Sequence, residues 1–116
     1  MHSFGLTWEV IKSFPIIFLD GDITLEAKQL LEDTYKEIIN QLDAKILIFD
    51  FSKTDYINST GISYFLNILQ RHKERGGEFI FTSLSDHIKK VMNIVGLTDY
   101  VKVFSTTETA IKYLDK

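Results

Sequence analysis

The stretch that decides the fold of this chain is ILIFDFSKTDYINSTGI, residues 46–62. Its first part, Ile46–Phe51, is a mostly apolar run that is typical of a β-strand buried on both faces of a sheet. After a short polar loop, the sequence predicts an amphipathic helix that begins near Ser59, runs to about Arg75 and ends at Gly76-Gly77. The apolar stripe of this helix consists of Ile62, Phe65, Ile68 and Leu69.

Strand and helix patterns alternate outward from this stretch in both directions. Further strands are predicted at Leu6–Ile11, Ile16–Leu19, Glu78–Thr82 and Val101–Phe104. Further helices are predicted from Thr24 to Leu42, from Ser85 to Val95 and from Ser105 to Leu114. The expected core faces of the first two are Ala27, Leu30, Leu31, Ile38, Ile39 and Leu42, and Ile88, Val91, Met92 and Val95.

This alternation predicts the fold class. Consecutive strands joined by helical crossovers of this length run parallel, with right-handed connections. The first two strands are separated only by a turn at Lys12–Pro15, which predicts an antiparallel hairpin. We therefore expect residues 1–116 to form a single α/β domain. Its sheet should be largely parallel, with four to five strands, an N-terminal antiparallel hairpin at its edge and about four helices.

Composition excludes several classes of protein. The chain has no cysteine, so it lacks disulfides and thiolate metal sites and suits a reducing cytoplasm. Its net charge is −3, and its scattered basic residues do not form the basic face of a nucleic-acid binder. No apolar run approaches the roughly 18 residues that span a bilayer, and no signal peptide is expected. We expect a cytoplasmic protein with no nucleic-acid or membrane partner.

The histidines do not suggest a metal site. His2 lies at the N-terminus, while His72 and His87 lie in predicted helices, where surface positions are expected. No two of the three have the spacing of metal ligands. We expect neither a metal nor a cofactor.

Few residues suggest catalysis. Ser59 does not lie in a Gly-x-Ser-x-Gly nucleophile motif, and no glycine-rich loop opens a helix to hold a phosphate. Asp22, Asp50 and Asp55 could approach one another at the end of the sheet, but loop solvation and helix capping are the favoured roles. We expect no catalytic residue and favour a binding role.

The junction between loop and helix carries a pair of hydroxyls, Ser59 and Thr60. The first turn of a helix has unpaired N–H groups and the positive end of the helix dipole, so it would stabilise a phosphate there. In a purely structural alternative, Asn58 or Ser59 caps the helix and Gly61 lets the helix approach the sheet. Functional residues of parallel sheets gather where strands end. Other polar residues expected at that edge are Asp22, Thr24, Ser83 and Ser85.

Several segments, in this order and spacing, resemble one known family. They are Asp50-Phe51-Ser52, Tyr56–Ile62 and Arg75–Phe79, supported by Gly21-Asp22-Ile23 and Val91–Leu97. Together they resemble bacterial anti-sigma factor antagonists, the single-domain members of the STAS (sulfate transporter and anti-sigma antagonist) family. The resemblance covers the chain from about Leu6 to Leu114, so it implies a STAS-like domain over residues 1–116.

The resemblance implies a phosphorylation-controlled switch between protein partners. In that family the unphosphorylated protein binds an anti-sigma factor that is also an ATP-dependent serine kinase, and this frees the sigma factor for transcription. The kinase then phosphorylates a serine, the complex dissociates, and a phosphatase restores the first state.

Carried onto this chain, the resemblance makes Ser59 the phosphoacceptor, with Thr60 as the alternative. The partner-binding residues would be Asp22, Thr24, Asn58, Ser59, Thr60, Gly61 and Ile62. Asn58 stands where the family usually has Asp, which keeps the capping oxygen and removes a negative charge.

Two alternatives remain open from the sequence. The chain could be an adaptor in a signalling assembly that binds its partner without a phosphorylation cycle. It could instead be a small-ligand or enzymatic domain that uses a pocket at the strand ends. We expect a monomer, because the sheet and helix faces account for the apolar residues.

Overall fold

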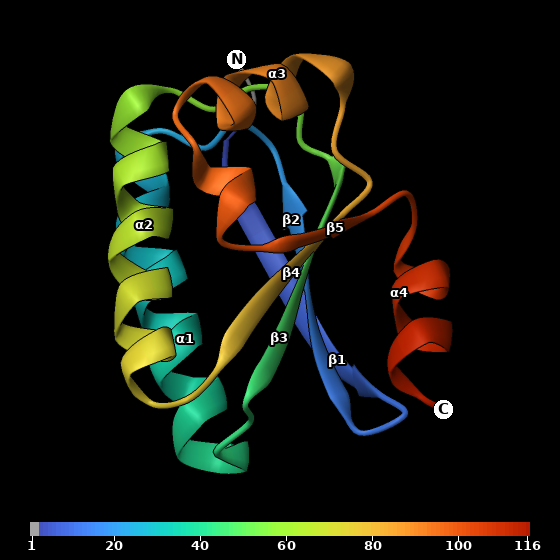
Figure 1. The fold of residues 1–116 in the computed structure, drawn as a ribbon. Coiled ribbons are helices and arrows are strands. Elements are labelled where there is room, and N and C mark those ends of the chain that lie inside the picture. The colour runs from blue at the N-terminus through green and yellow to red at the C-terminus, as the bar shows by residue number, and fades with distance from the viewer. Residues whose placement is uncertain (1–2) are drawn as a thin grey trace.

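Five strands form one sheet in the computed structural model, which describes residues 3–116 (Figure 1). They are β1 (Gly5–Ile11), β2 (Phe14–Asp20), β3 (Ile46–Lys53), β4 (Glu78–Thr82) and β5 (Lys102–Phe104). The strands lie in the order β1-β2-β3-β4-β5, with β1 antiparallel to β2 and every other neighbouring pair parallel. The predicted parallel sheet with an antiparallel hairpin at its edge is confirmed.

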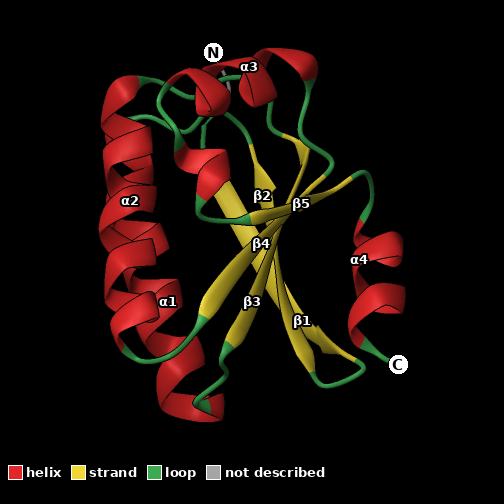
Figure 2. Ribbon diagram, in the orientation of Figure 1, coloured by secondary structure: helices red, strands yellow, loops and turns green. Residues whose placement is uncertain are grey.

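Helices cover both faces of this sheet. They are α1 (Lys28–Leu42), α2 (Ser59–Glu74), α3 (Asp86–Ile94) and α4 (Thr107–Leu114), with short 3₁₀ turns η1 (Leu25–Ala27) and η2 (Leu97–Asp99). Figure 2 shows α1 and α2 side by side on one side of the sheet and α4 on the other. The core residues of α3 and η2 belong to the same cluster as those of α1 and α2, so α4 covers its face without a second helix among the described residues.

The strand register explains this division of the core. Ile17, Phe49 and Phe81 are in register on β2, β3 and β4, and their side chains pack under α1, α2 and α3. One residue earlier on each strand, Ile16, Ile48 and Ile80 are also in register, and they pack under α4. Because successive side chains of a strand point to opposite faces, both faces of the central strands are mostly apolar.

The hairpin turn differs from the predicted one. Lys12 and Ser13 form it alone, with φ angles of 54° and 75°, while Pro15 lies buried within β2 and in register with Val10. Two consecutive positive φ values are typical of a tight hairpin turn, whose twist matches that of the strands. The prediction that the turn extends to Pro15 is therefore wrong.

Some predicted core positions lie at the surface. Leu30 and Leu42 of α1 are 38% and 43% exposed, and Val95 after α3 is 48% exposed. Leu30 lies at the edge of the apolar stripe, while Leu42 and Val95 lie at the ends of their helices. Thr34 and Tyr35 fill the middle turn of the same face of α1 and are buried.

His72 is buried, so the prediction of a surface histidine is wrong. Its Nε2–H donates a hydrogen bond to the Lys45 carbonyl at 2.7 Å, and its Nδ1 accepts one from the Tyr35 hydroxyl at 3.0 Å. Burial lowers the pKa of His72 and the charges of Arg75 and Lys45 act in the same direction, while the hydrogen bond to the Lys45 carbonyl opposes them. His2, the third histidine besides the exposed His87, lies outside the described residues.

Candidate functional site

The site begins at the cap of α2. Asn58 is in an extended conformation, and its side-chain oxygen accepts a hydrogen bond from the Gly61 N–H at 2.9 Å. Asn58 is therefore the capping residue, and Ser59 is the first residue of the helix. Because the amide of Asn58 caps the helix, the Ser59 hydroxyl is not needed for that role.

Ser59 is exposed and Thr60 is half-buried. The backbone carbonyl of Ser59 accepts a hydrogen bond from the Ser63 hydroxyl at 3.0 Å, one turn further along α2. A negative group on the Ser59 oxygen would lie against the first turn of a 16-residue helix, where the helix dipole stabilises negative charge. The geometry is therefore suitable for a phosphoryl group.

Backbone hydrogen bonds join the loop after β2 to the loop before α2. The Ile23 N–H donates to the Tyr56 carbonyl at 3.0 Å, and the Asn58 N–H donates to the Ile23 carbonyl at 3.2 Å. These bonds form a short parallel bridge between Ile23 and Ile57. The bridge brings the neighbours of Ile23, Asp22 and Thr24, beside the start of α2, as the sequence predicted for residues at the ends of parallel strands.

Two of the predicted partner-binding residues do not offer a surface. Gly61 is buried, and a Cβ atom there would overlap the Ile23 carbonyl oxygen. Ile62 is only 6% exposed and belongs to the core under α2. These two residues hold α2 close to the segment after β2, so the accessible part of the predicted set is Asp22, Thr24, Asn58, Ser59 and Thr60.

Thr24, where the sequence predicts the first helix to begin, does not cap that helix with its side chain. It precedes the 3₁₀ turn η1, and its side chain makes no capping hydrogen bond there. Only its carbonyl is used, as an acceptor for the Ala27 N–H at 3.0 Å. The half-buried Thr24 side chain is thus available beside the site.

Two exposed apolar residues adjoin the predicted set and were missed from the sequence. Leu25, next to Thr24, is 67% exposed, and Tyr56 is 45% exposed. The Tyr56 ring lies nearly parallel to the ring of His87 at the start of α3, with centroids 6.4 Å apart. A large apolar side chain at the tip of a loop is the signal that could have identified both.

Two other polar residues at the strand ends, Asp50 and Ser85, have structural roles. Asp50 is buried and accepts hydrogen bonds from the Ser52 N–H at 2.8 Å and the Thr107 hydroxyl at 2.7 Å, which ties α4 to the sheet. Ser85 caps α3 by accepting from the Ile88 N–H at 3.2 Å. Asp50 shares the α4 face of β3 with Ile48, away from the α2 side.

Comparison with known proteins places this arrangement in a family. The family model of the STAS domain matches residues 6–110. The chain belongs to the STAS domain family.

Two relatives of this STAS domain are named anti-sigma-B factor antagonists. It is 24% identical over 87 residues to the anti-sigma-B factor antagonist of Listeria monocytogenes, covering 75% of each chain. It is 25% identical over 93 residues to the anti-sigma-B factor antagonist of Bacillus subtilis, covering 79% of this chain and 83% of that protein.

Solved structures share the fold. An anti-sigma factor antagonist from Mycobacterium paratuberculosis superposes with a TM-score of 0.84 at 15% identity, covering 98% of this chain and 96% of that one. The anti-sigma factor antagonist SpoIIAA in its unphosphorylated form gives a TM-score of 0.77 at 22% identity, covering 97% and 96%. The phosphorylated form of the Bacillus protein SpoIIAA gives 0.72 at 22% identity, covering 97% and 99%.

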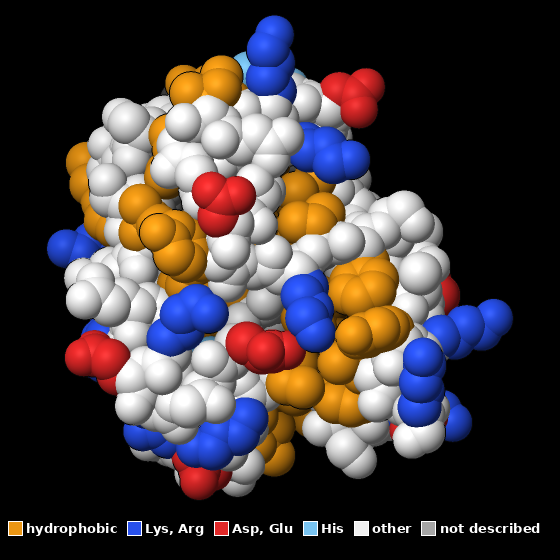
Figure 3. Space-filling view, in the orientation of Figure 1, with side chains coloured by type: hydrophobic (Ala, Val, Ile, Leu, Met, Phe, Trp, Pro, Cys, Tyr) orange, Lys and Arg blue, Asp and Glu red, His pale blue; other side chains and the backbone are white. Residues whose placement is uncertain are grey.

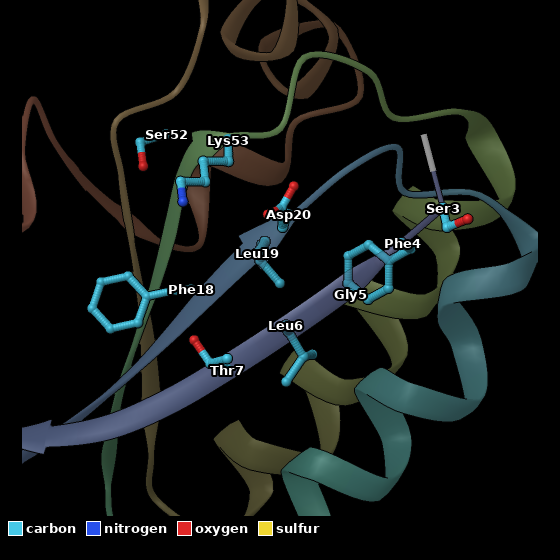
Figure 4. Close-up of a pocket in the computed structure, with 10 residues that line it drawn as sticks. All are labelled: Ser3, Phe4, Gly5, Leu6, Thr7, Phe18, Leu19, Asp20, Ser52 and Lys53. Carbon is cyan, nitrogen blue, oxygen red and sulfur yellow. The ribbon is translucent and has the colours of Figure 1, made fainter. Parts of the chain in front are cut away.

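A separate hollow of about 550 Å³ lies between the start of β1 and the end of β2 (Figure 4). It is lined by Ser3, Phe4, Gly5, Leu6, Thr7, Phe18, Leu19, Asp20, Ser52 and Lys53. None of the predicted partner-binding residues is among these ten. The surface around Ser59 and this hollow are therefore different features of the STAS domain.

Among residues 3–116, no group of three or more histidine, aspartate or glutamate side chains is placed to hold a metal ion. Within the same range, no helix has both the length and the apolar character required to cross a lipid bilayer.

Proposed function

We propose that this STAS domain is an anti-sigma factor antagonist that works as a phosphorylation-switched binding protein in the cytoplasm. In this proposal, the unphosphorylated monomer binds an anti-sigma factor with serine kinase activity through the surface around Ser59, and thereby releases a sigma factor. The observation that carries the proposal is the exposed Ser59 hydroxyl on the first turn of α2, beside a separate capping residue.

The charge of the phosphoryl group supplies the switch. A phosphoserine carries about −1.5 to −2 charges at pH 7. The start of α2 can accommodate that charge in the free domain, since the helix dipole favours it. A partner packed over Ser59 would have to remove water from the phosphate, and a change of about 2–3 kcal/mol in binding free energy suffices to reverse occupancy. A phosphatase would restore the binding form.

The proposal is tested with the serine-kinase anti-sigma factors encoded in the source organism, each purified and mixed with the domain and ATP. We expect mass spectrometry to find one phosphate, on Ser59, with one of these kinases. Ser59→Ala should abolish phosphorylation and retain binding, whereas Ser59→Asp should weaken binding at least tenfold in calorimetry. Thr60→Ala is the matched control and should still be phosphorylated.

Two results would contradict this function. If no such kinase binds or phosphorylates the domain, the anti-sigma role fails. If a kinase binds Ser59→Ala and Ser59→Asp equally well, the domain is instead an adaptor that binds its partner without a phosphorylation cycle. The neutral side chain of Asn58 in the place of the family's usual Asp is compatible with that second function.

A further inference from the structure

The outward face of α2 carries no charge over most of its length. Residues 59–70 contain no acidic or basic side chain. The exposed members of this run are Ser59, Ser63, Leu66, Asn67 and Gln70. The neighbouring helix α1 has an ordinary charged surface, with Lys28, Asp33, Lys36 and Glu37 exposed. Because the centres of protein interfaces are depleted in charged residues, the uncharged face distinguishes α2 as an interface helix.

This uncharged face leads from Ser59 to an apolar groove. The groove has a volume of about 580 Å³ and is lined by Leu66, Leu69, Gln70, Lys73, Glu74 and Tyr100. Leu66 is 38% exposed and Tyr100, just after η2, is 61% exposed. Figure 3 shows hydrophobic side chains at the surface where α2 and the η2 segment lie side by side in Figure 1.

The groove and the phosphoacceptor lie on the same side of α2. Ser59, Ser63, Leu66 and Gln70 are separated by four, three and four residues, a spacing that places side chains in one row along a helix. At 1.5 Å per residue, Leu66 lies about 10 Å along the helix from Ser59. An interface of ordinary size, about 800 Å² on each partner, covers both positions.

Charged residues at the rim indicate what the groove binds. Lys73 and Glu74 flank it at the end of α2. The ion pairs of the described residues join Lys12 to Asp115, Arg71 to Glu32 and Arg75 to Asp43, so neither rim charge is paired within that part of the chain. An amphipathic helix would match the groove and its rim if it inserts an apolar side chain, places an acidic residue near Lys73 and places a basic residue near Glu74.

We propose that this groove is a second anchor for the anti-sigma kinase that binds at Ser59, and that an apolar side chain from a helix of the kinase fills it. The inference rests on the function proposed above and extends it. The anchor contributes to binding whether or not Ser59 is phosphorylated, because it lies about two helical turns away from the phosphoryl group. Phosphorylation then lowers the affinity of the complex without removing this contact.

Leu66→Asp and Tyr100→Ala test the anchor, measured with the kinase that phosphorylates the wild-type domain. We expect each to raise the dissociation constant of the unphosphorylated complex about tenfold or more, as loss of a buried interface anchor does. In steady-state phosphorylation of Ser59, KM should rise in parallel while kcat is retained, since the groove does not touch the reacting hydroxyl. Val10→Asp is the matched control, because Val10 is similarly exposed, at 47%, but lies on β1, at the opposite edge of the sheet from β5.

The outcomes separate this inference from the proposed function. If no kinase binds the wild-type domain, both fail. If the kinase binds the wild type and rejects Ser59→Asp, but binds Leu66→Asp and Tyr100→Ala as tightly as the wild type, only the anchor is disproved. If Leu66→Asp unfolds in a thermal melt, the exposed Tyr100→Ala substitution decides the question alone.

Discussion

At the scale of single residues, Asn58 caps α2 and leaves the hydroxyl of Ser59 available for the phosphorylation that we propose. The Asn58 amide satisfies the Gly61 N–H, so the helix does not depend on the serine for its cap. Modification of Ser59 can then proceed without removing a hydrogen bond that begins α2. If Ser59 is phosphorylated as proposed, the start of α2 therefore keeps its capping hydrogen bond.

Replacement of the cap should therefore affect stability more than replacement of Ser59. Asn58→Ala removes the acceptor for Gly61 and should lower the free energy of unfolding by about 1 kcal/mol. Urea denaturation monitored by circular dichroism measures the change. Asn58→Asp keeps an acceptor and adds a favourable negative charge at the helix start, so it should be at least as stable as the wild type. Equal losses for the two variants would show that the cap does not act through this oxygen.

The buried His72 should make stability depend on pH. Its pKa is lowered in the folded state, so the unfolded chain takes up a proton first as the pH falls. The stabilising effect of the neutral ring is complete above the unfolded pKa of about 6.5 and is lost below it. The groups around the ring are the Tyr35 hydroxyl, the Lys45 carbonyl and the cations of Lys45 and Arg75. None of them supplies a negative charge to hold a proton.

Urea unfolding at pH 7.5 and 5.5 measures this effect. The wild type should be less stable at pH 5.5, while His72→Gln should lose most of the pH dependence. His87→Gln, at an exposed position, should keep it. The lowered pKa of Glu32, caused first by its hydrogen bond with Arg71, affects stability only at more acidic pH, so it does not interfere. A wild-type stability that is flat between these pH values would contradict the assignment.

At the scale of elements, the position of α2 depends on its close approach to the segment after β2. Gly61 faces the Ile23 carbonyl, and no side chain fits between them. The same contact that allows the bridge between Ile23 and Ile57 therefore also fixes where Ser59 lies. A shift of α2 would therefore also move Ser59.

Gly61→Ala tests this dependence. Alanine is favoured over glycine within a helix by about 1 kcal/mol, yet the added methyl group would collide with backbone atoms that cannot rotate away. We expect a net loss of about 1–3 kcal/mol in unfolding free energy, together with slower phosphorylation of Ser59. Gly5→Ala is the control, since a Cβ there meets nothing within 4 Å. A stabilised Gly61→Ala variant would show that α2 can shift freely.

At the scale of the whole molecule, the sequence predicted the sheet, its hairpin edge and the helix order because these follow from local periodicity. It placed Ser59 at a helix start because the change from strand to helix pattern is visible in residues 46–62. It could not predict the hydrogen bonds that satisfy the buried ring of His72, because Tyr35 and the Lys45 carbonyl are distant in the chain. His72 continues the apolar row of Ile62, Phe65 and Leu69, which was the available signal.

The candidate site was predicted less completely than the fold, for the same reason. Asp22 and Thr24 were expected near Ser59 from the topology of parallel strands, but the exposure of Leu25 and Tyr56 depends on how the two loops pair. Likewise, the groove beside Tyr100 requires α2 and η2 to meet, and no pattern along the sequence encodes that meeting.

The bridge between Ile23 and Ile57 has a kinetic consequence. The loop after β2 and the loop before α2 share backbone hydrogen bonds, which restrict the conformations of both. The loops therefore lose little conformational entropy when a protein binds to them. A protein partner can then associate and dissociate without any rearrangement of these loops. In the proposed function, the lifetime of the complex would then depend on the phosphoryl group on Ser59 alone.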